Sequence, residues 1–166
     1  MTIALLIIAL AVLQRAVELI YAECNTRRLL ARGAVEAGKG HYPLMIALHA
    51  GWLAAIVIFL PPGPPIHLLP LAIFIVLQAL RVWVIATLGP YWTTRIVSLP
   101  GAPLVRRGPY RFLRHPNYVI VTGEIAALPL VFGEIVVAIV FTALNLALLF
   151  WRVRIEDMAL DSRRGL

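Results

Sequence analysis

Residues 66–88 read IHLLPLAIFIVLQALRVWVIATL, an apolar run of the length that a single helix needs to cross a bilayer. Four further runs of similar character occupy roughly residues 3–23, 43–60, 117–132 and 134–151. The chain has 166 residues and is 61% hydrophobic, whereas a soluble domain averages about 45–50%. We therefore expect an all-α, polytopic membrane protein with about five transmembrane helices, forming one integral membrane domain over residues 1–166.

The links between these runs indicate how the predicted helices connect. A proline cluster at residues 61–65 ends the second run, because proline cannot continue a helix. The fourth run is short and contains Pro129, so we expect it to be broken, tilted or only partly inserted. Residues 132–134 form a tight link, which predicts that the fourth and fifth runs make an antiparallel hairpin.

The net charge of +7 is concentrated after the first, third and fifth runs. The basic residues there are Arg27, Arg28, Arg32 and Lys39, then Arg95, Arg106, Arg107, Arg111 and Arg114, and finally Arg152, Arg154, Arg163 and Arg164. The two remaining links hold no lysine or arginine. The positive-inside bias then predicts an N-terminus outside and a C-terminus in the cytoplasm, in the cell inner membrane. Arginines at membrane edges favour membrane lipids over nucleic acid as partners.

The composition gives little support to disulfide or metal chemistry. Cys24 is the sole cysteine, which excludes an internal disulfide and a multi-cysteine metal site. His41 and His49 are eight residues apart with no carboxylate placed as a third ligand, so we expect no metal ion. Packing or hydrogen bonding is the favoured role for both histidines, and a proton acceptor on the substrate side is the alternative.

Charged residues inside the apolar runs need partners, because an unpaired charge is costly within a membrane. Glu18 in the first run and Arg81 in the third are expected to form an ion pair that holds the bundle together, or else to line a substrate cavity. Glu124 in the fourth run is either hydrogen-bonded to a neighbour such as Asn145 or a general base poised by burial.

Two polar patches flank the last two runs. Residues 108–118 read GPYRFLRHPNY, a cluster that is expensive to hold beside hydrocarbon unless it does chemistry. In the fifth run and its C-terminal helical extension, Asn145, Arg152 and Glu156 share one face at spacings of seven and four. Such a face lets Arg152 hold an anion in the membrane while Glu156 holds a polar ligand in the cytoplasm. The alternative is that Arg152 and Arg154 bind lipid headgroups and Glu156 is solvated.

These motifs together resemble the isoprenylcysteine carboxyl methyltransferase family. The resemblance rests on Gly108-Pro109-Tyr110, on Arg114-His115-Pro116-Asn117-Tyr118, and on the acidic pair Glu156-Asp157 followed by Leu160. It implies a multi-span membrane enzyme that uses S-adenosylmethionine without a Rossmann domain. In keeping with that, the chain has no Gly-x-Gly-x-x-Gly fingerprint.

By position, the resemblance implies roles for individual residues. A cytoplasmic loop and the start of the fourth helix would surround the cofactor, within a cofactor-binding part at residues 88–166. The residues concerned are Ala102, Pro103, Leu104, Val105, Tyr110, His115, Pro116, Asn117 and Tyr118. Glu156 would bind the polar part of the cofactor and Arg152 would hold the methyl acceptor, which makes these two the candidate catalytic residues.

The resemblance implies a lipophilic small molecule or a lipidated substrate as the methyl acceptor. Asp157 stands where the family has a second Glu, Ile120 stands where a Gly often occurs, and the chain ends soon after Leu160. In these three features the sequence differs from the family members that recognise a prenylated protein terminus. The short chain looks more like the bacterial branch, which includes O-methyltransferases of long-chain alkylpyrones and alkylresorcinols. A carboxylate acceptor is already ionised, whereas a phenol-like hydroxyl needs proton removal, with which His41, His49 or Glu124 can assist.

Two other classes of function are compatible with the sequence. A small membrane transporter would use Glu18, Arg81 and Glu124 as a pathway through the bilayer. A non-catalytic membrane scaffold related to the family would need none of these residues. Only the enzyme requires saturable binding of S-adenosylhomocysteine.

Overall fold

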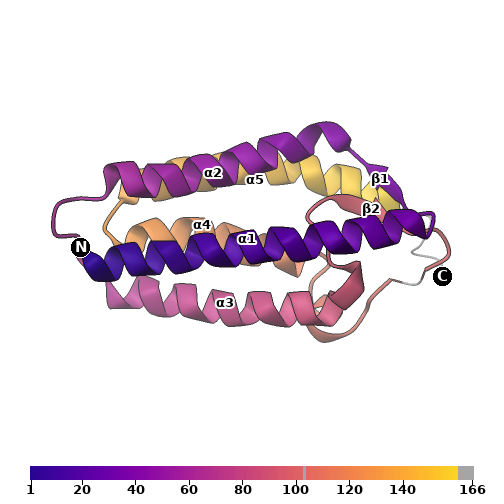
Figure 1. The fold of residues 1–166 in the computed structure, drawn as a ribbon, viewed down its shortest axis with the longest axis horizontal. Helices are drawn as coiled ribbons and strands as arrows, with labels where there is room; N and C mark the ends of the chain where they lie inside the picture. The colour runs from indigo at the N-terminus through magenta and orange to yellow at the C-terminus, as the bar shows by residue number, and fades with distance from the viewer. Residues whose placement is uncertain (103, 161–166) are drawn as a thin grey trace.

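The computed structural model describes residues 1–102 and 104–160, whose helices run side by side along one long axis (Figure 1). In this part of the chain the α-helices are α1 (Thr2–Ala31), α2 (Tyr42–Phe59), α3 (Leu68–Leu88), α4 (Pro116–Val131) and α5 (Ile135–Leu160). The links contain two strands, β1 (Val35–Ala37) and β2 (Ile96–Ser98), and three short 3-10 helices, η1 (Lys39–His41), η2 (Gly89–Tyr91) and η3 (Gly108–Arg111). The prediction of an all-α, membrane-like architecture is confirmed.

Four helices of the described chain are long and apolar enough to cross a membrane, namely α1, α2, α3 and α5. Helix α4 has 16 residues, which gives about 24 Å against a hydrocarbon core of about 30 Å. The expectation of a short fourth run was therefore correct. Of the three alternatives for this run, the structure excludes a break, because Pro129 lies near the end of α4 and the helix continues past it to Val131.

Helix α1 turns a narrow face of small and polar side chains toward the bundle. Its buried residues recur every three or four positions, and include Ala4, Ile8, Ala11, Glu18, Ala22, Asn25, Thr26 and Leu29. Its other faces expose large apolar side chains such as Leu6, Leu13 and Ile20, which suit contact with lipid. The helix continues to Ala31, beyond the predicted end near residue 23.

The apolar core lies where α2, α4 and α5 meet α3 and α1. The largest fully buried apolar side chains there are Trp52, Phe132, Ile56, Ile125 and Leu128. A Cβ added at Gly123 would lie 2.9 Å from Leu77 Cδ1, so α3 and α4 approach closely at this glycine. Residues 132–134 turn the chain from α4 into α5, which confirms the predicted hairpin.

A two-stranded antiparallel sheet joins two distant links at one end of the bundle. Val35 pairs with Ser98, and Ala37 pairs with Ile96. The strands therefore tie the link after α1 to the link after α3, beside the C-terminal part of α5 (Figure 1). This end of the bundle also holds both polar patches.

Candidate functional site

The link between α3 and α4 folds back against the end of α3. Gly108 has a φ of +57°, and a Cβ added there would lie 2.6 Å from Thr87 Oγ1. Only glycine combines that backbone conformation with so close an approach. The chain then passes through η3 and enters α4 at Pro116, a position where the missing N–H of proline costs nothing.

A cavity of about 510 Å³ lies between this link, the end of α3 and the C-terminal part of α5. Small-molecule sites in proteins typically measure about 300–1,000 Å³. The predicted site residues on its wall are Leu104, Val105, Tyr110, His115, Asn117, Tyr118, Arg152 and Glu156. The two polar patches therefore meet around one cavity.

Tyr118 links the start of α4 to the end of α5. Its hydroxyl oxygen accepts a hydrogen bond from Arg152 Nε at 2.7 Å, and its O–H donates to the Glu156 carboxylate. The Arg152 guanidinium also lies 5.5 Å from the centroid of the Tyr118 ring. Glu156 is thus bonded to protein, which contradicts the alternative in which it is only solvated.

His115 packs against this group and contacts the carboxylates of Glu156 and Asp157. Its ring stacks on Tyr118 with centroids 5.3 Å apart. Its Nδ1 lies 3.7 Å from Glu156 Oε1, and its Nε2 lies 3.2 Å from Asp157 Oδ1. Interaction with Glu156, followed by Asp157, raises the pKa of His115 above its ordinary value and outweighs the opposing effect of burial. The imidazolium form is therefore favoured.

Two residues of the cavity wall carry a polar atom without a hydrogen-bond partner among the described residues. Among the described residues, Asn117 Oδ1 and Arg95 Nε are buried and have no hydrogen-bond partner. Burial, assisted by the charge of Glu156, raises the pKa of the Tyr110 hydroxyl, which therefore stays protonated. The wall thus offers an acceptor at Asn117 and a donor at Arg95.

Arg152 is buried among neutral groups. Its Nη1 donates to His41 Nε2 at 2.8 Å, and its Nη2 donates to the Thr94 carbonyl oxygen at 2.8 Å. In the part of the chain that the structure describes, no carboxylate lies within ion-pair distance of Arg152. A buried guanidinium so placed suits an anionic or partly anionic oxygen of a ligand.

Other predicted site residues lie away from the cavity wall. Ala102 and Pro116 do not line it, and Pro103 lies outside the described residues. The Nδ1 of His49 is hydrogen-bonded to the Met45 carbonyl oxygen at 2.8 Å, and its ring packs edge-on against Trp52. The expected packing and hydrogen-bonding role of His49 is therefore confirmed.

Part of the cavity wall was not identified from the sequence. This part comes from the ends of α1 and α3, from the segment around β2 and from the link after it, and it comprises Leu29, Leu88, Tyr91, Trp92, Thr93, Ile96, Val97, Leu99 and Arg106. Asn25 of α1 holds this segment, since its Nδ2 donates to the Trp92 carbonyl oxygen at 2.9 Å. The available signal was the aromatic pair Tyr91-Trp92 directly after the third apolar run.

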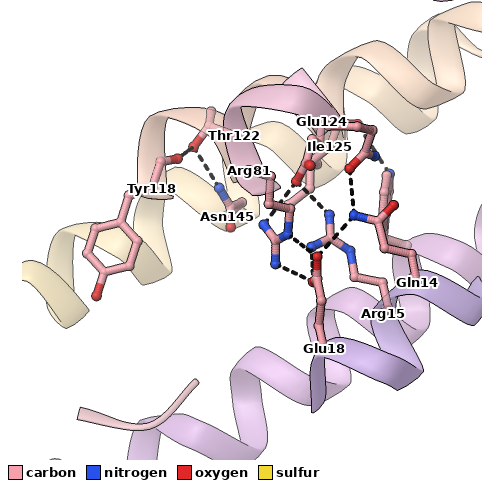
Figure 2. Close-up of polar contacts among 11 residues, drawn as sticks. Gln14, Arg15, Glu18, Arg81, Tyr118, Thr122, Glu124, Ile125 and Asn145 are labelled. Atoms are coloured by element: carbon pink, nitrogen blue, oxygen red, sulfur yellow. Dashed lines mark hydrogen bonds and ion pairs between the residues drawn. The ribbon is translucent and has the colours of Figure 1, made fainter. Parts of the chain in front are cut away.

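A second polar cluster lies deeper in the bundle and joins α1, α3 and α4 (Figure 2). Arg81 forms two hydrogen bonds with Glu18, at 2.6 and 2.7 Å, and contacts Glu124 at 3.1 Å. Arg15 contacts Glu124 at 2.6 Å and Glu18 at 3.1 Å. The predicted Glu18–Arg81 ion pair is confirmed. The four charges, two of each sign, balance one another.

Glu124 has different neighbours from those expected. The sequence suggested Asn145, but Asn145 Nδ2 donates to Thr122 Oγ1 at 3.0 Å, as Figure 2 shows. Because residues 122 and 124 point to different sides of α4, Glu124 faces α1 and α3 while Thr122 faces α5. Glu124 is fully buried between two arginines and is not on the cavity wall.

Comparison with known proteins identifies related sequences. The model of the isoprenylcysteine carboxyl methyltransferase (ICMT) family matches residues 69–162. An uncharacterized protein of Bacillus subtilis (strain 168), YpbQ, is 38% identical over 160 residues, which cover 94% of this chain and 95% of the relative. An uncharacterized protein of Haemophilus influenzae is 30% identical over 142 residues, covering 82% of this chain and 83% of the relative. No solved structure gave a significant match.

Proposed function

Because the chain belongs to the isoprenylcysteine carboxyl methyltransferase (ICMT) family, we propose that it is an S-adenosylmethionine-dependent O-methyltransferase with a lipophilic methyl acceptor. The family is one of membrane methyltransferases, and the apolar helices make this chain an integral membrane protein. The observation that carries the proposal is the contact of Tyr118 with both Arg152 and Glu156 on the wall of one cavity.

The cavity wall fits the chemical groups of S-adenosylmethionine. The cofactor has amino groups, ribose hydroxyls and a carboxylate, so it needs acceptors as well as a cationic donor. The unpartnered Asn117 Oδ1 and the Glu156 carboxylate are acceptors, and Arg95 Nε is a donor from a charged group. Tyr110 adds an aromatic face and a protonated hydroxyl. These residues are the ones we propose to hold the cofactor.

The acceptor oxygen is assigned to Arg152. This guanidinium is buried and has neutral hydrogen-bond partners, so a carboxylate, phenolate or enolate oxygen would be its first direct anionic contact. The lipid tail of the acceptor would remain between the helices. The proposed acceptors are an isoprenylcysteine-type carboxylate or the hydroxyl of a long-chain alkylpyrone or alkylresorcinol.

When bound, the cofactor supplies a methyl group on a sulfonium sulfur, and transfer of that group needs no protein nucleophile. The residues of the site therefore act by alignment, which can lower a barrier by about 7–11 kcal/mol. Glu156 and Asn117 hold one reactant, and Arg152 holds the other. Tyr118 fixes the distance between the Glu156 carboxylate and the Arg152 guanidinium, because its hydroxyl is hydrogen-bonded to both.

The proposal also includes the orientation of the helix bundle in the membrane. We place the end of the bundle that holds the cavity in the cytoplasm of a bacterial inner membrane, where S-adenosylmethionine is made. The arginines after α1 and α3 lie at this end, in agreement with the positive-inside rule. The balanced charges of the cluster formed by Arg15, Glu18, Arg81 and Glu124 favour a structural role for it over a transport pathway.

Binding of S-adenosylhomocysteine to the detergent-purified protein tests the cofactor assignment. Isothermal titration calorimetry should give saturable binding to the wild type. In Glu156→Gln the affinity should fall about tenfold or more, because charge-assisted hydrogen bonds are lost while the shape is kept. Glu134→Gln is the matched control, since this buried carboxyl lies at the α4–α5 link, at the opposite end of the bundle. Equal affinity in all three proteins would contradict the assignment.

The acceptor class is tested with labelled S-adenosylmethionine and two probes. One probe is a farnesylated cysteine with a free carboxylate, and the other is a long-chain hydroxypyrone. Methyl transfer to either supports the O-methyltransferase proposal and identifies the acceptor oxygen. Absence of transfer to both probes and to total membrane lipids would refute it.

A further inference from the structure

The hydrogen bonds of Arg152 show which groups orient its guanidinium. Nε donates to Tyr118 at 2.7 Å, Nη2 to the Thr94 carbonyl oxygen at 2.8 Å, and Nη1 to His41 Nε2 at 2.8 Å. Each guanidinium nitrogen thus has one partner, and the partners come from α4, from the link before β2 and from η1. His41 belongs to η1, which precedes α2 and is far from the other partners in sequence.

The contact with Arg152 determines the form of the His41 ring. A guanidinium carries donors and no acceptor, so Nε2 of His41 must be the acceptor in this bond. The ring is therefore neutral, with its proton on Nδ1. A doubly protonated ring would place an N–H against the N–H of Arg152 and one positive charge against another. The bond exists only while His41 is neutral.

The backbone around His41 is shaped to bring it to α5. Gly38, which precedes η1, has a φ of +60°. A Cβ added to Gly38 would lie 2.8 Å from Ile155 Cγ2 and 2.9 Å from His41 Nδ1. The segment is further held because β1 pairs with β2 and because the Tyr42 hydroxyl lies 3.1 Å from Thr94 Oγ1. Two of the three partners of Arg152 are thus tied together by the small sheet.

We propose that His41 is a positioning residue for Arg152, whose neutral imidazole orients the guanidinium toward the methyl acceptor. The inference rests on the proposed function and adds a residue that lies outside the segment matched by the family, residues 69–162. His41 is buried and is not on the cavity wall, so it acts through Arg152 and not on the acceptor itself.

The charged groups around His41 make this arrangement sensitive to pH. Arg152 and Glu156 of α5 and Glu36 of β1 face the ring. Of these, Arg152 makes the direct contact. Acidification that protonates His41 breaks the Nη1 bond and releases one side of the guanidinium. We therefore expect activity to fall toward acid pH as His41 becomes protonated. Burial and the positive charge of Arg152 disfavour the protonated ring, so this fall should lie below about pH 6.5, the ordinary pKa of histidine.

The tautomer is tested without any assay of activity. The chain has four histidines, so ¹⁵N-histidine labelling in detergent micelles gives few signals, and His41→Gln assigns the one that disappears. At pH 8 the His41 signals should show a protonated Nδ1 and an unprotonated Nε2. A protonated Nε2 would overturn the proposal, because the bond with Arg152 could not then exist.

The positioning role is tested by kinetics with the acceptor that is turned over. His41→Ala should lower kcat about tenfold or more, as expected for a lost hydrogen bond to a charged group, with the affinity for S-adenosylhomocysteine within about twofold of wild type. His41→Gln keeps an acceptor oxygen and should restore most of kcat while removing the fall in activity toward acid pH. His67→Gln, at the opposite end of the bundle, is the control and should keep the wild-type pH profile.

The outcomes separate the two proposals. A pH profile of His41→Gln that matches wild type would overturn the role of His41 while the methyltransferase remains. A parallel loss of cofactor affinity in His41→Ala would also overturn it, by indicating general damage. Failure of the wild type to bind S-adenosylhomocysteine would refute the proposed function, whereas the tautomer of His41 would still decide whether it holds Arg152.

Discussion

The Tyr118 hydroxyl satisfies both of its hydrogen-bonding directions within the site. It donates to Glu156 and accepts from Arg152, so the two charged side chains are connected through a neutral group. Direct contact between a glutamate and an arginine would have paired their charges and left neither for a ligand. Inserting a tyrosine keeps the carboxylate and the guanidinium apart and oriented. The charge of Arg152 is thereby left for a ligand, while Glu156 also contacts His115 Nδ1 at 3.7 Å.

His115 gives the site a dependence on pH that can be derived from its surroundings. Its pKa in the folded protein is raised above the value of 6.5 by Glu156 and Asp157. The stabilising contribution is therefore fully present below about pH 6.5 and is lost as the pH rises through the folded-state pKa. We predict that the difference in unfolding temperature between wild type and His115→Gln is largest at pH 6 and shrinks toward alkaline pH. Thermal unfolding in detergent at a series of pH values measures this, and a difference that grows with pH would contradict it.

At the scale of elements, the small sheet and η1 act as a brace on the end of α5. The brace depends on Gly38, where a left-handed backbone and close contacts with Ile155 and His41 coincide. We predict that Gly38→Ala lowers the free energy of unfolding by about 1–3 kcal/mol, through a strained φ and overpacking. Thermal or denaturant unfolding in detergent gives the measurement.

Gly40 provides a matched control two residues away. A Cβ added there meets no atom within 4 Å. Gly40→Ala should therefore change stability by less than about 0.5 kcal/mol. Equal destabilisation by the two substitutions would show that the close approach at Gly38 is unimportant.

The elements differ in how far their sequence predicts them. The long helices were predictable because each apolar run has the length of a membrane crossing. The hairpin of α4 and α5 was predictable because a link of only three residues keeps the two helices side by side. The strands were not, because each has three residues and its partner lies about sixty positions away. Whether α4 is continuous was left open, since the effect of Pro129 depends on its place near the helix end.

The candidate site was predictable where its residues adjoin in the chain. Arg152 and Glu156, at a spacing of four, and His115, Asn117 and Tyr118, in one short run, are brought together by the structure around one cavity. The position of Glu124 opposite Arg15 and Arg81 was not predictable, because contacts between helices are set by their rotation and packing. The wall contributed by β2 was missed for the same reason.

At the scale of the whole molecule, the buried charge cluster connects α1 to the rest of the bundle. The inward face of α1 has small side chains at Ala4, Ala11 and Ala22, so it offers little apolar surface for packing. Ion pairs and hydrogen bonds at Arg15 and Glu18 compensate for this. Their strength depends on every charge having its partner.

We predict that Arg81→Met is strongly destabilising, by about 3–5 kcal/mol, because it leaves buried carboxylates without their shared cation. The double variant Glu18→Met with Arg81→Met should recover most of that loss. It removes one charge of each sign and keeps the Arg15–Glu124 pair, whose atoms are 2.6 Å apart. A double-mutant cycle of unfolding free energies in detergent measures the coupling. Purely additive losses would contradict the role given to the cluster.

The same cluster constrains how the chain is made. Helix α1 emerges from the ribosome first and carries Arg15 and Glu18, but Arg81 and Glu124 are synthesised only after a further sixty or more residues. Until then, Arg15 and Glu18 have only each other as charged partners among the residues that the structure describes, at 3.1 Å on the same helix. We therefore expect α1 to take its final place in the bundle only after α3 and α4 supply the remaining counter-charges.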